Sequence, residues 1–463
     1  MRKRPFCLLM IIAQLGVVHA QLPENTTAVT TVDNVEYIVN YDWKGNACTR
    51  GIEKEWQPVV VRDKIEYEGI EYPVTAVGTF SFNREAENGT TSVVLPNSII
   101  DIRERAFFRS AIREINIPSS VKKLGLRCFT ESKQLSKVEL NDGLEEIETC
   151  AFSYCPLLES ITIPKTVKKL GVALFSGATG MRHLSVSPDN PIYDSREGCN
   201  AIIETASNEL VVACENTSFI PKTVTTIGNN AFSGISSIET LTLPYSVTTL
   251  KDFAFQNCKK LSKVIIPNNV KEVSFSAFLD CDNLGSIVIE DGTEPLEMTL
   301  YNVKSSGSTN PLREIYYGRE TLSGPPIEEN KDRYDYNGTS EIRTLTIGPL
   351  IKEVKWNFSD SLQTVKSLIQ DPTNVQVNFH DIVYQNATLI VPNGTKHLYQ
   401  SAEGWKNFAT ILEEGETAIR GISAGSPAEL IRYSLDGRRL AAPQKGINII
   451  RMSDGSTRKV IVK

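Results

Sequence analysis

The chain has 463 residues, of which 41% are hydrophobic and 22% are charged, values typical of a folded soluble protein rather than a disordered one. This length is enough for two or three ordinary domains or for one long repeat array. The formal net charge of −6 gives no reason to expect nucleic acid or an anionic membrane surface as a partner.

Residues 1–20 have the features of a secretory signal peptide. Positions 2–4 are basic, residues 6–18 are apolar apart from Gln14, and Ala20 ends a small-residue cleavage pattern. The apolar run is too short to span a bilayer as a helix, and no later stretch reaches 18 unbroken apolar residues. We therefore expect an exported chain with no transmembrane span.

Residues 21–85 lack a clean repeat. Runs rich in β-branched and aromatic residues at 35–39, 59–61 and 70–74 predict short strands, and Phe80 ends a stretch that resembles a degenerate first coil of the array that follows. Because the first apolar face of a repeat array needs a cover, we predict an N-terminal β cap here.

An internal repeat dominates residues 86–290. Segments of the form Ile-x-Ile-Pro recur, and a phenylalanine, usually preceded by alanine, follows each such proline by eleven residues. Successive phenylalanines are 22 or 23 residues apart, with one step of 57 residues. They are Phe107, Phe129, Phe152, Phe175, Phe232, Phe255 and Phe278.

Each repeat predicts one coil of a solenoid. The alternation Ile-x-Ile indicates a short strand with one buried face, and the proline ends it because it cannot donate to a strand ladder. The phenylalanine is the largest interior group. One coil cannot bury its own apolar face, but coils stacked about 4.8 Å apart can. We predict a β-rich repeat solenoid with few short helices and a parallel sheet along one face, coiled right-handed.

This repeat resembles the BspA-like leucine-rich-repeat family of bacterial surface proteins, whose units share the Ile-x-Ile-Pro and Ala-Phe pattern. The resemblance is strong over residues 70–290 and extends weakly to 412. Proline stands where other leucine-rich repeats carry asparagine after the strand, which favours the BspA-like branch. The resemblance implies a surface protein that binds host or bacterial ligands.

The long step places an insertion at 187–220. Residues 200–203 and 210–213 are strand-like and predict a β-hairpin that projects from the solenoid. A turn centred midway between them would place Cys199 directly opposite Cys214, at a separation compatible with a disulfide. The alternative is two buried free thiols.

Other cysteines recur at fixed repeat positions. Cys155, Cys258 and Cys281 each follow their phenylalanine by three residues, and Cys128 and Cys150 fall just before theirs. A cysteine that recurs in this way is most simply a small interior hydrophobic residue, so we expect all five to be buried and uncrosslinked.

The repeat decays over residues 291–413. A final strand at 389–392 is followed by Tyr399, Trp405 and Phe408, whose rings we expect to close the stack as a C-terminal cap.

Residues 416–463 form a separate piece with room for three or four short strands. Its Asp-Gly-Arg, Lys-Gly-Ile and terminal Lys-Val-Ile-Val-Lys elements resemble the C-terminal sorting domain of the type IX secretion pathway in Bacteroidota. That resemblance implies a cell-surface or extracellular protein. If the signal is inactive, the protein would stay in the periplasm, and the segment would be a small β module without a sorting role.

No catalytic, metal-binding or cofactor-binding pattern is found in the sequence. After residue 20 the only histidines are His183, His380 and His397, and no His-Glu-x-x-His, Cys-x-x-Cys, Gly-x-Ser-x-Gly or phosphate-binding glycine loop is present. We therefore expect a binding protein that needs no cofactor. A site hidden within 291–412 is the remaining route to an enzyme.

The outward side chains of the strands form the candidate contact surface, because a solenoid presents them in register. Aromatic rings are scarce among them, so no feature singles out carbohydrate over protein as the ligand. We expect a monomer that binds a protein or glycan as an adhesin; the alternative is a structural or nutrient-capture accessory of the bacterial envelope. The candidate contact residues are Glu114, Asn116, Lys137, Glu139, Thr162, Thr240, Thr242 and Lys263.

Overall fold

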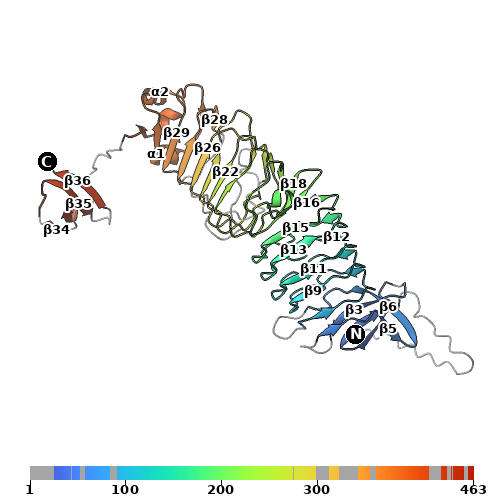
Figure 1. Ribbon diagram of the computed structural model, residues 1–463. Helices are drawn as coiled ribbons and strands as arrows, with labels where there is room; N and C mark the ends of the chain where they lie inside the picture. The colour runs from blue at the N-terminus through green and yellow to red at the C-terminus, as the bar shows by residue number, and fades with distance from the viewer. Residues whose placement is uncertain are drawn as a thin grey trace, which may run out of the picture. The chain divides into compact units, whose positions relative to one another are not determined.

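The computed structural model describes residues 26–42, 44–52, 58–83, 91–274, 276–298, 312–322, 342–354, 361–416, 429–434, 439–440, 442–452 and 457–462. The predicted signal peptide lies outside these residues. The chain divides into two compact units, Met1–Glu414 and Gly415–Lys463 (Figure 1).

An N-terminal β cap opens the first unit. Strands β1, β2 and β3 form an antiparallel meander, and β3 pairs in parallel with β6, whose hairpin partner is β5. Because β6 also pairs in parallel with β8, the cap sheet runs directly into the solenoid. The bounds are β1 (Ala28–Val32), β2 (Val35–Val39), β3 (Ala47–Ile52), β5 (Lys64–Tyr67), β6 (Ile70–Val77) and β8 (Asp101–Ile102).

The predicted parallel sheet of the solenoid is confirmed. Its strands bury every second side chain, as the Ile-x-Ile alternation requires. We call the surface made by their outward side chains the strand face. Its strands are β4 (Val59–Val60), β7 (Val93–Val94), β9 (Glu114–Asn116), β11 (Lys137–Glu139), β13 (Ser160–Ile163), β15 (His183–Val186), β20 (Thr240–Thr242), β22 (Lys263–Ile266), β24 (Ser286–Ile289), β26 (Glu314–Tyr317), β27 (Thr344–Ile347), β29 (Thr364–Ser367), β31 (Thr388–Val391) and β32 (Thr410–Glu413).

A second row of two-residue strands forms another side of the coils. In the N-terminal half it continues from β8 through β10 (Lys123–Leu124), β12 (Glu146–Ile147) and β14 (Lys169–Leu170), all parallel; we call its outer surface the ladder face. In the C-terminal half the row comprises β19 (Thr226–Ile227), β21 (Thr249–Leu250), β23 (Glu272–Val273) and β25 (Glu297–Met298), followed by the pair β28 (Glu353–Val354) and β30 (Gln376–Val377).

The repeated phenylalanines stack inside the third side of the coils. The rings of Phe107 and Phe129 are nearly parallel, and their centroids are 4.9 Å apart. Phe255 stacks on Phe232 in the same way, also at 4.9 Å. Five of the seven repeat phenylalanine N–H groups donate to a carbonyl of the next coil, as Phe129 does to Ala151 at 2.9 Å. This side of the solenoid is therefore held by a backbone ladder as well as by the rings.

Two residues before and two residues after each repeat phenylalanine from Phe107 to Phe255, the backbone is left-handed. In the coil of Phe129, for example, Arg127 and Glu131 have φ values of 56° and 61°. This conformation turns the backbone sharply on both sides of the buried ring and points the side chains at both positions outward. L-residues other than glycine, asparagine and aspartate rarely adopt it.

The first coil is built around Phe82 rather than Phe80. The Phe82 ring stacks on Phe107 with centroids 5.0 Å apart. Phe80 lies two residues earlier, at φ 58°, and is 42% exposed. The prediction that Phe80 ends the first coil is wrong by two residues. The sequence shows two nearby phenylalanines, but it does not show that left-handed backbone at Phe80 directs that side chain outward.

The inserted hairpin does not project. Its strands, β17 (Ala201–Glu204) and β18 (Glu209–Ala213), are followed in the sheet by β19 in parallel and preceded by β16 (Tyr193–Asp194). Alternate side chains enter two different cores: Ile203 packs with the C-terminal coils and Ile202 with the N-terminal coils, both fully buried. The hairpin is thus an internal layer between two halves of the solenoid, and the predicted projection is wrong.

On the phenylalanine side, no layer separates the two halves. The hydroxyls of Ser176 and Ser233 lie 3.0 Å apart, and a Cβ on Gly234 would lie 2.7 Å from the Gly177 nitrogen. Glycine is therefore required where these coils meet. Since the hairpin adds a layer on one side only, the stack turns at this point, between the strand runs β9–β15 and β22–β29 of Figure 1.

Of the two alternatives for Cys199 and Cys214, the structure has the buried free thiols and not the disulfide. The hairpin pairs Ile203 with Leu210 as expected, but a bulge then shifts the register, so that Ala201 pairs with Ala213. One extra residue moves Cys214 to the other face of the hairpin, and the Cys214 thiol donates to the Asn200 carbonyl at 3.3 Å.

The prediction of buried cysteines holds for four of the five repeat positions. The thiols of Cys155, Cys258 and Cys281 are buried, and each donates at 3.1–3.2 Å to the phenylalanine carbonyl of the preceding coil. The hydroxyl of Ser132 makes the same bond to Phe107 at 2.7 Å. The position therefore favours a small donor as well as a small volume.

Cys150 is the exception, being only partly buried, whereas Cys128 is fully buried. Cys128 occupies the interior position directly before its phenylalanine. Cys150 lies one residue further back, at a left-handed position with φ 58°, where side chains point outward.

Aromatic residues close the far end of the first unit. Tyr399, on α2 (Lys396–Ser401), packs edge-on against Trp405, and its hydroxyl donates to the Ile369 carbonyl at 2.6 Å. Phe408 packs against Tyr384 on α1 (Asp381–Asn386), with ring centroids 5.0 Å apart. The rings predicted to close the stack are buried, and β32 follows them as one more strand.

The second unit is a four-stranded antiparallel sheet in the order β34-β33-β35-β36. Its strands are β33 (Glu429–Ser434), β34 (Arg439–Leu440), β35 (Gly446–Met452) and β36 (Thr457–Val462). The Arg432 guanidinium donates to the Asn448 side chain at 3.1 Å, which links the two central strands. The unit boundary lies one residue from the predicted start of the C-terminal module.

Candidate functional site

The strand face carries the eight predicted contact residues, and all eight side chains are exposed as expected. Register places Glu114 beside Lys137, Asn116 beside Glu139, and Thr240 beside Lys263. They belong to two separate regions, however. The residues on β9 and β11, together with Thr162 on β13, lie before the hairpin layer, and those on β20 and β22 lie after it.

The two regions differ in how their side chains are bonded. Before the hairpin, Lys137 pairs with Glu139 at 2.5 Å, Asn116 accepts from Asn141 at 2.8 Å, and the Thr162 hydroxyl lies 2.9 Å from that of Ser185. After it, the side chains of Thr240, Thr242 and Lys263 make no hydrogen bond or ion pair with any described residue. These three therefore keep their full capacity to bond a ligand.

The strand face also starts earlier than the repeat pattern indicates. Strand β4 of the cap pairs in parallel with β7, so Val60 and Val94 lie side by side, 57% and 55% exposed. A parallel bridge from Ser92 to Glu114 connects this pair to β9. The two valines add an apolar edge that repeat spacing could not reveal, because β4 lies outside the repeat.

Ion pairs cover the ladder face. Glu145 accepts from Lys168 at 2.8 Å, and Glu146 pairs with Lys169 at 2.6 Å. Lys123 bonds Glu148 at 2.6 Å. The hydrogen bond from Lys169 helps to hold the pKa of Glu146 below its usual range. Opposite charges one coil apart neutralise each other here, so this face offers few unpaired charges to a ligand.

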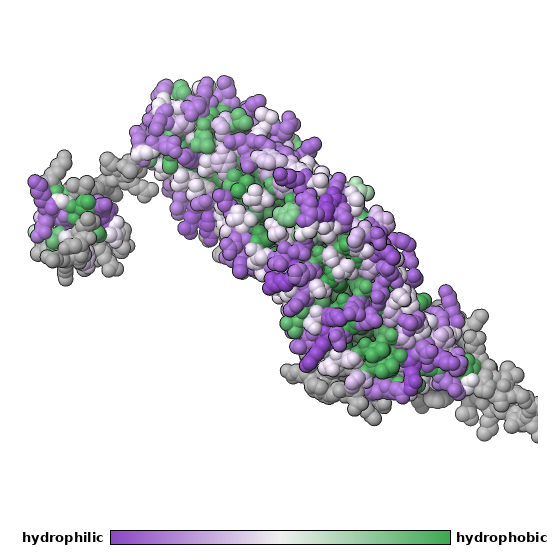
Figure 2. Space-filling view, in the orientation of Figure 1, coloured by the Kyte–Doolittle hydropathy of each residue, from purple (hydrophilic) through white to green (hydrophobic). Residues whose placement is uncertain are grey.

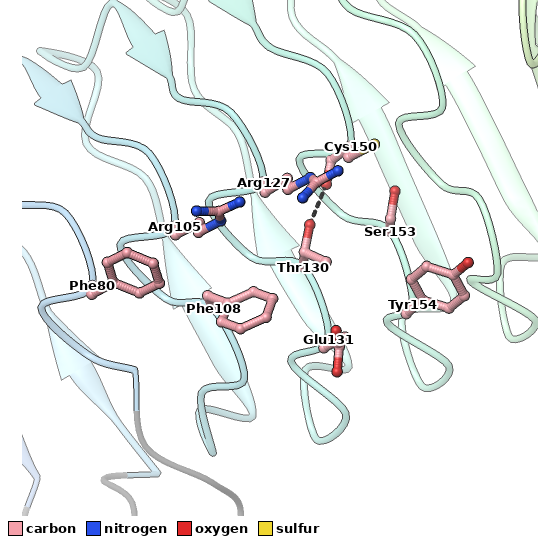
Figure 3. Close-up of a pocket in the computed structure, with 9 residues that line it drawn as sticks. All are labelled: Phe80, Arg105, Phe108, Arg127, Thr130, Glu131, Cys150, Ser153 and Tyr154. Carbon is pink, nitrogen blue, oxygen red and sulfur yellow. Dashed lines mark hydrogen bonds between the residues drawn. The ribbon is translucent and has the colours of Figure 1, made fainter.

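A shallow groove of about 410 Å³ crosses the phenylalanine side of the first four coils (Figure 3). Sequence reasoning did not identify it. Its lining comes from the left-handed positions and from the residue that follows each buried phenylalanine. The lining residues are Phe80, Arg105, Phe108, Arg127, Thr130, Glu131, Cys150, Ser153 and Tyr154.

The sequence does contain a pattern that indicates left-handed backbone on the phenylalanine side. Gly177, Gly234, Asn230 and Asn257 stand at the same two offsets from their phenylalanines in later coils, and these residue types favour left-handed backbone. Their recurrence predicts that the matching residues of earlier coils share this conformation and point outward.

No catalytic or metal site emerges from the described residues. Within them, no group of three or more His, Cys, Asp or Glu side chains is placed to hold a metal ion. His183 is exposed at the start of β15. Within the same residues, no helix is both long enough and apolar enough to cross a membrane.

A model of the BspA-type leucine-rich-repeat region matches residues 63–187 and 209–308, in six copies. The repeats are therefore similar to BspA-type leucine-rich repeats. The match stops at residue 187, just after β15, and resumes at residue 209, where β18 begins, so β16 and β17 lie outside the matched repeats. A comparison with curated proteins gave no match.

A comparison with solved structures found several similar chains. The pneumococcal vaccine antigen PcpA is 19% identical over 84% of this chain and 99% of its own, with a TM-score of 0.51. A leucine-rich cell surface protein from Faecalibacterium prausnitzii is 17% identical over 74% and 95% of the two chains, with a TM-score of 0.44. A leucine-rich repeat protein from Bacteroides ovatus is 17% identical over 83% and 99%, also at 0.44.

Proposed function

We propose that this chain is an exported, surface-exposed scaffold that binds a protein or glycan ligand through the strand face, as an adhesin does. The observation that carries the proposal is the set of unbonded side chains Thr240, Thr242 and Lys263, held in register on parallel strands. A ligand that bonds them loses little entropy in ordering the protein, since the sheet already fixes their spacing.

The contrast with the ladder face supports the same surface. There the charges pair with each other from coil to coil, whereas the strand face after the hairpin leaves the hydroxyls of Thr240 and Thr242 and the ammonium of Lys263 available. Figure 2 shows hydrophobic residues interspersed among hydrophilic ones on the side of the molecule in view.

Export is part of the proposal. It is supported by the basic and apolar start of the chain at 1–20 and by the likeness of 416–463 to a type IX sorting domain, which also suggests a host among the Bacteroidota. The folded, separate C-terminal sheet is consistent with a module that a secretion machinery can handle independently of the solenoid.

The binding test uses the chain from residue 21 and a panel of immobilised extracellular-matrix proteins and glycans. A Thr240→Arg, Thr242→Arg variant should reduce binding at least tenfold, because it crowds the strand face without touching the core. The matched control, Lys168→Ala with Lys169→Ala on the ladder face, should bind within twofold of the parent. A panel without a binder, or equal loss in both variants, would refute the proposal.

The export test compares the full chain with a version that ends at residue 415, both expressed in a type IX-competent host. We expect the full chain on the cell surface and the truncated chain in the periplasm. If both chains reach the surface, residues 416–463 are not a sorting signal.

A further inference from the structure

The groove on the phenylalanine side is lined by bulky residues at positions where the backbone favours small ones. Phe80, Arg105, Arg127 and Cys150 stand two residues before their phenylalanines, all with φ between 52° and 58°. Side chains with a Cβ strain this conformation. The conformation itself belongs to the repeat, since it recurs outside the groove at Phe253, so the side chains and not the backbone give the groove its character.

The residues two after each phenylalanine show the same contrast. Glu131 and Tyr154 occupy this position in the groove, whereas later coils have Gly177 and Gly234 there. Tyr154 also depends on its neighbour: a Cβ on Gly177 would lie 2.5 Å from Tyr154 Cδ1. Glycine in the next coil therefore makes room for a tyrosine ring that is 52% exposed.

Aromatic rings and one unpaired cation dominate the chemistry of the groove. Phe80 meets Phe108 edge-on at 6.2 Å, with the Arg105 guanidinium 5.5 Å from the Phe80 ring centroid. Arg105 is also paired with Glu104 at 3.3 Å. Arg127, between these rings and Tyr154 in Figure 3, is exposed and forms no ion pair with a described residue.

The hydroxyl groups in the groove are already bonded to the coils. Thr130 donates to the Cys150 carbonyl and Ser153 to the Ala173 carbonyl, both at 2.6 Å. The one acidic side chain of the lining, Glu131, is paired with Arg109 at 2.9 Å. Among the lining side chains, the guanidinium of Arg127 is thus the group that remains for a charged partner.

We propose that this groove binds an extended peptide segment of another protein, one in which a carboxylate is flanked by apolar side chains. The carboxylate pairs with Arg127, whose planar guanidinium can donate two parallel hydrogen bonds to it. The flanking side chains pack on the Phe80 and Phe108 rings on one side and on Tyr154 on the other. The strand face takes no part, so this site is independent of the function proposed above.

An anionic glycan fits the groove less well. Sugars need many free hydrogen-bonding side chains and a flat ring to stack on, but the Thr130 and Ser153 hydroxyls are occupied and two of the three rings meet edge-on. Charge complementarity with apolar flanks is the combination that a peptide supplies.

The test selects a phage-displayed library of nine-residue peptides on the immobilised chain from residue 21. We expect the recovered peptides to be enriched in Asp or Glu next to aromatic or aliphatic residues. A synthetic copy of the best peptide should bind Arg127→Gln at least tenfold more weakly than the parent, and Tyr154→Ala at least fivefold more weakly. The matched control Arg182→Gln, an exposed arginine outside the groove, should leave the affinity unchanged.

A second readout places the peptide. Cys150 lines the groove, so saturating peptide should slow its alkylation by a maleimide at least fivefold. Two results would overturn the proposal: peptides without acidic enrichment that bind Arg127→Gln as well as the parent, or a heparin fragment that protects Cys150 when no acidic peptide does. Loss of strand-face binding in Thr240→Arg, Thr242→Arg leaves this readout untouched, so the two proposals fail separately.

Discussion

The coils before and after the hairpin layer have the same interior but different exteriors. Phe129 and Phe255 stack in the same geometry, with fully buried rings. On the outside, the left-handed positions hold Arg127 and Glu131 in the earlier coil, but Phe253 and Asn257 in the later one, and glycine in the coils adjoining the hairpin. At these positions the earlier coil thus holds charged side chains where the later one holds an uncharged aromatic and an amide.

This difference shows that the interior and the exterior of one repeat are subject to different constraints. The interior is fixed by packing, since each ring must fill the same space in every coil. The exterior of the left-handed segment has no packing role, so glycine or asparagine would serve the fold better there. The proposed peptide site accounts for the charged and aromatic residues of the earlier coils, such as Arg127 and Tyr154, whereas Phe253 in a later coil lies outside the groove.

The largest expected effect tests the shared interior. Phe129→Ala and Phe255→Ala should each lower the free energy of unfolding by about 3–5 kcal/mol, because both leave a large cavity in a fully buried stack. Urea unfolding followed by circular dichroism measures both. A difference of more than about 2 kcal/mol between them would show that the two halves are not equivalent inside.

Much of this interior was predictable from the sequence. A fixed spacing of phenylalanine and proline determines which residues repeat, and alternation determines which of them face inward, so the strand row and its exposed side chains follow directly. The hairpin strands at 200–203 and 210–213 were predictable for the same reason. Hydrophobic pattern is a strong signal because burial is what it encodes.

Conformation and register were less predictable. A single bulge moved Cys214 to the opposite face of the hairpin, and no residue in the hairpin sequence predicts that bulge. The left-handed backbone at Cys150 turned its side chain outward, against the expectation that cysteines at repeat positions are interior. The groove was missed because its residues are not the types that favour the conformation they adopt.

The next largest effect should be the difference in reactivity between the outward-facing thiol of Cys150 and the buried thiols. Burial raises the pKa of the Cys155 thiol to about 12, so at pH 8 it stays protonated as well as inaccessible. Of the eight described thiols only Cys150 is not fully buried. In the folded chain Cys150 should react with a maleimide at least about a hundredfold faster than the rest, and Cys150→Ser should abolish the fast phase. Peptide mapping that finds another thiol labelled first would contradict the outward placement of Cys150.

Strain at the left-handed positions should be visible as a smaller change in stability. Arg127→Gly relieves about 1–2 kcal/mol of left-handed strain and loses about 0.5–1 kcal/mol of chain entropy, so it should stabilise the fold by about 0.5–1 kcal/mol. Asn257→Arg in a later coil should destabilise it by a similar amount. Thermal unfolding of both variants measures this. If Arg127→Gly is destabilising, the arginine supports the fold and the argument for the groove weakens.

The smallest effect belongs to the ladder face, where Lys168 pairs with Glu145 at 2.8 Å and both side chains are well exposed. Lys168→Gln should change the free energy of unfolding by less than about 0.5 kcal/mol, because exposed ion pairs gain little over hydration. The remaining difference should vanish in 1 M salt, which screens exposed charges. A larger loss of stability that persists in salt would mean that the ion pairs of the ladder face hold the coils together. The paired charges would then have a structural role, in contrast to the unpaired Arg127 of the proposed peptide site.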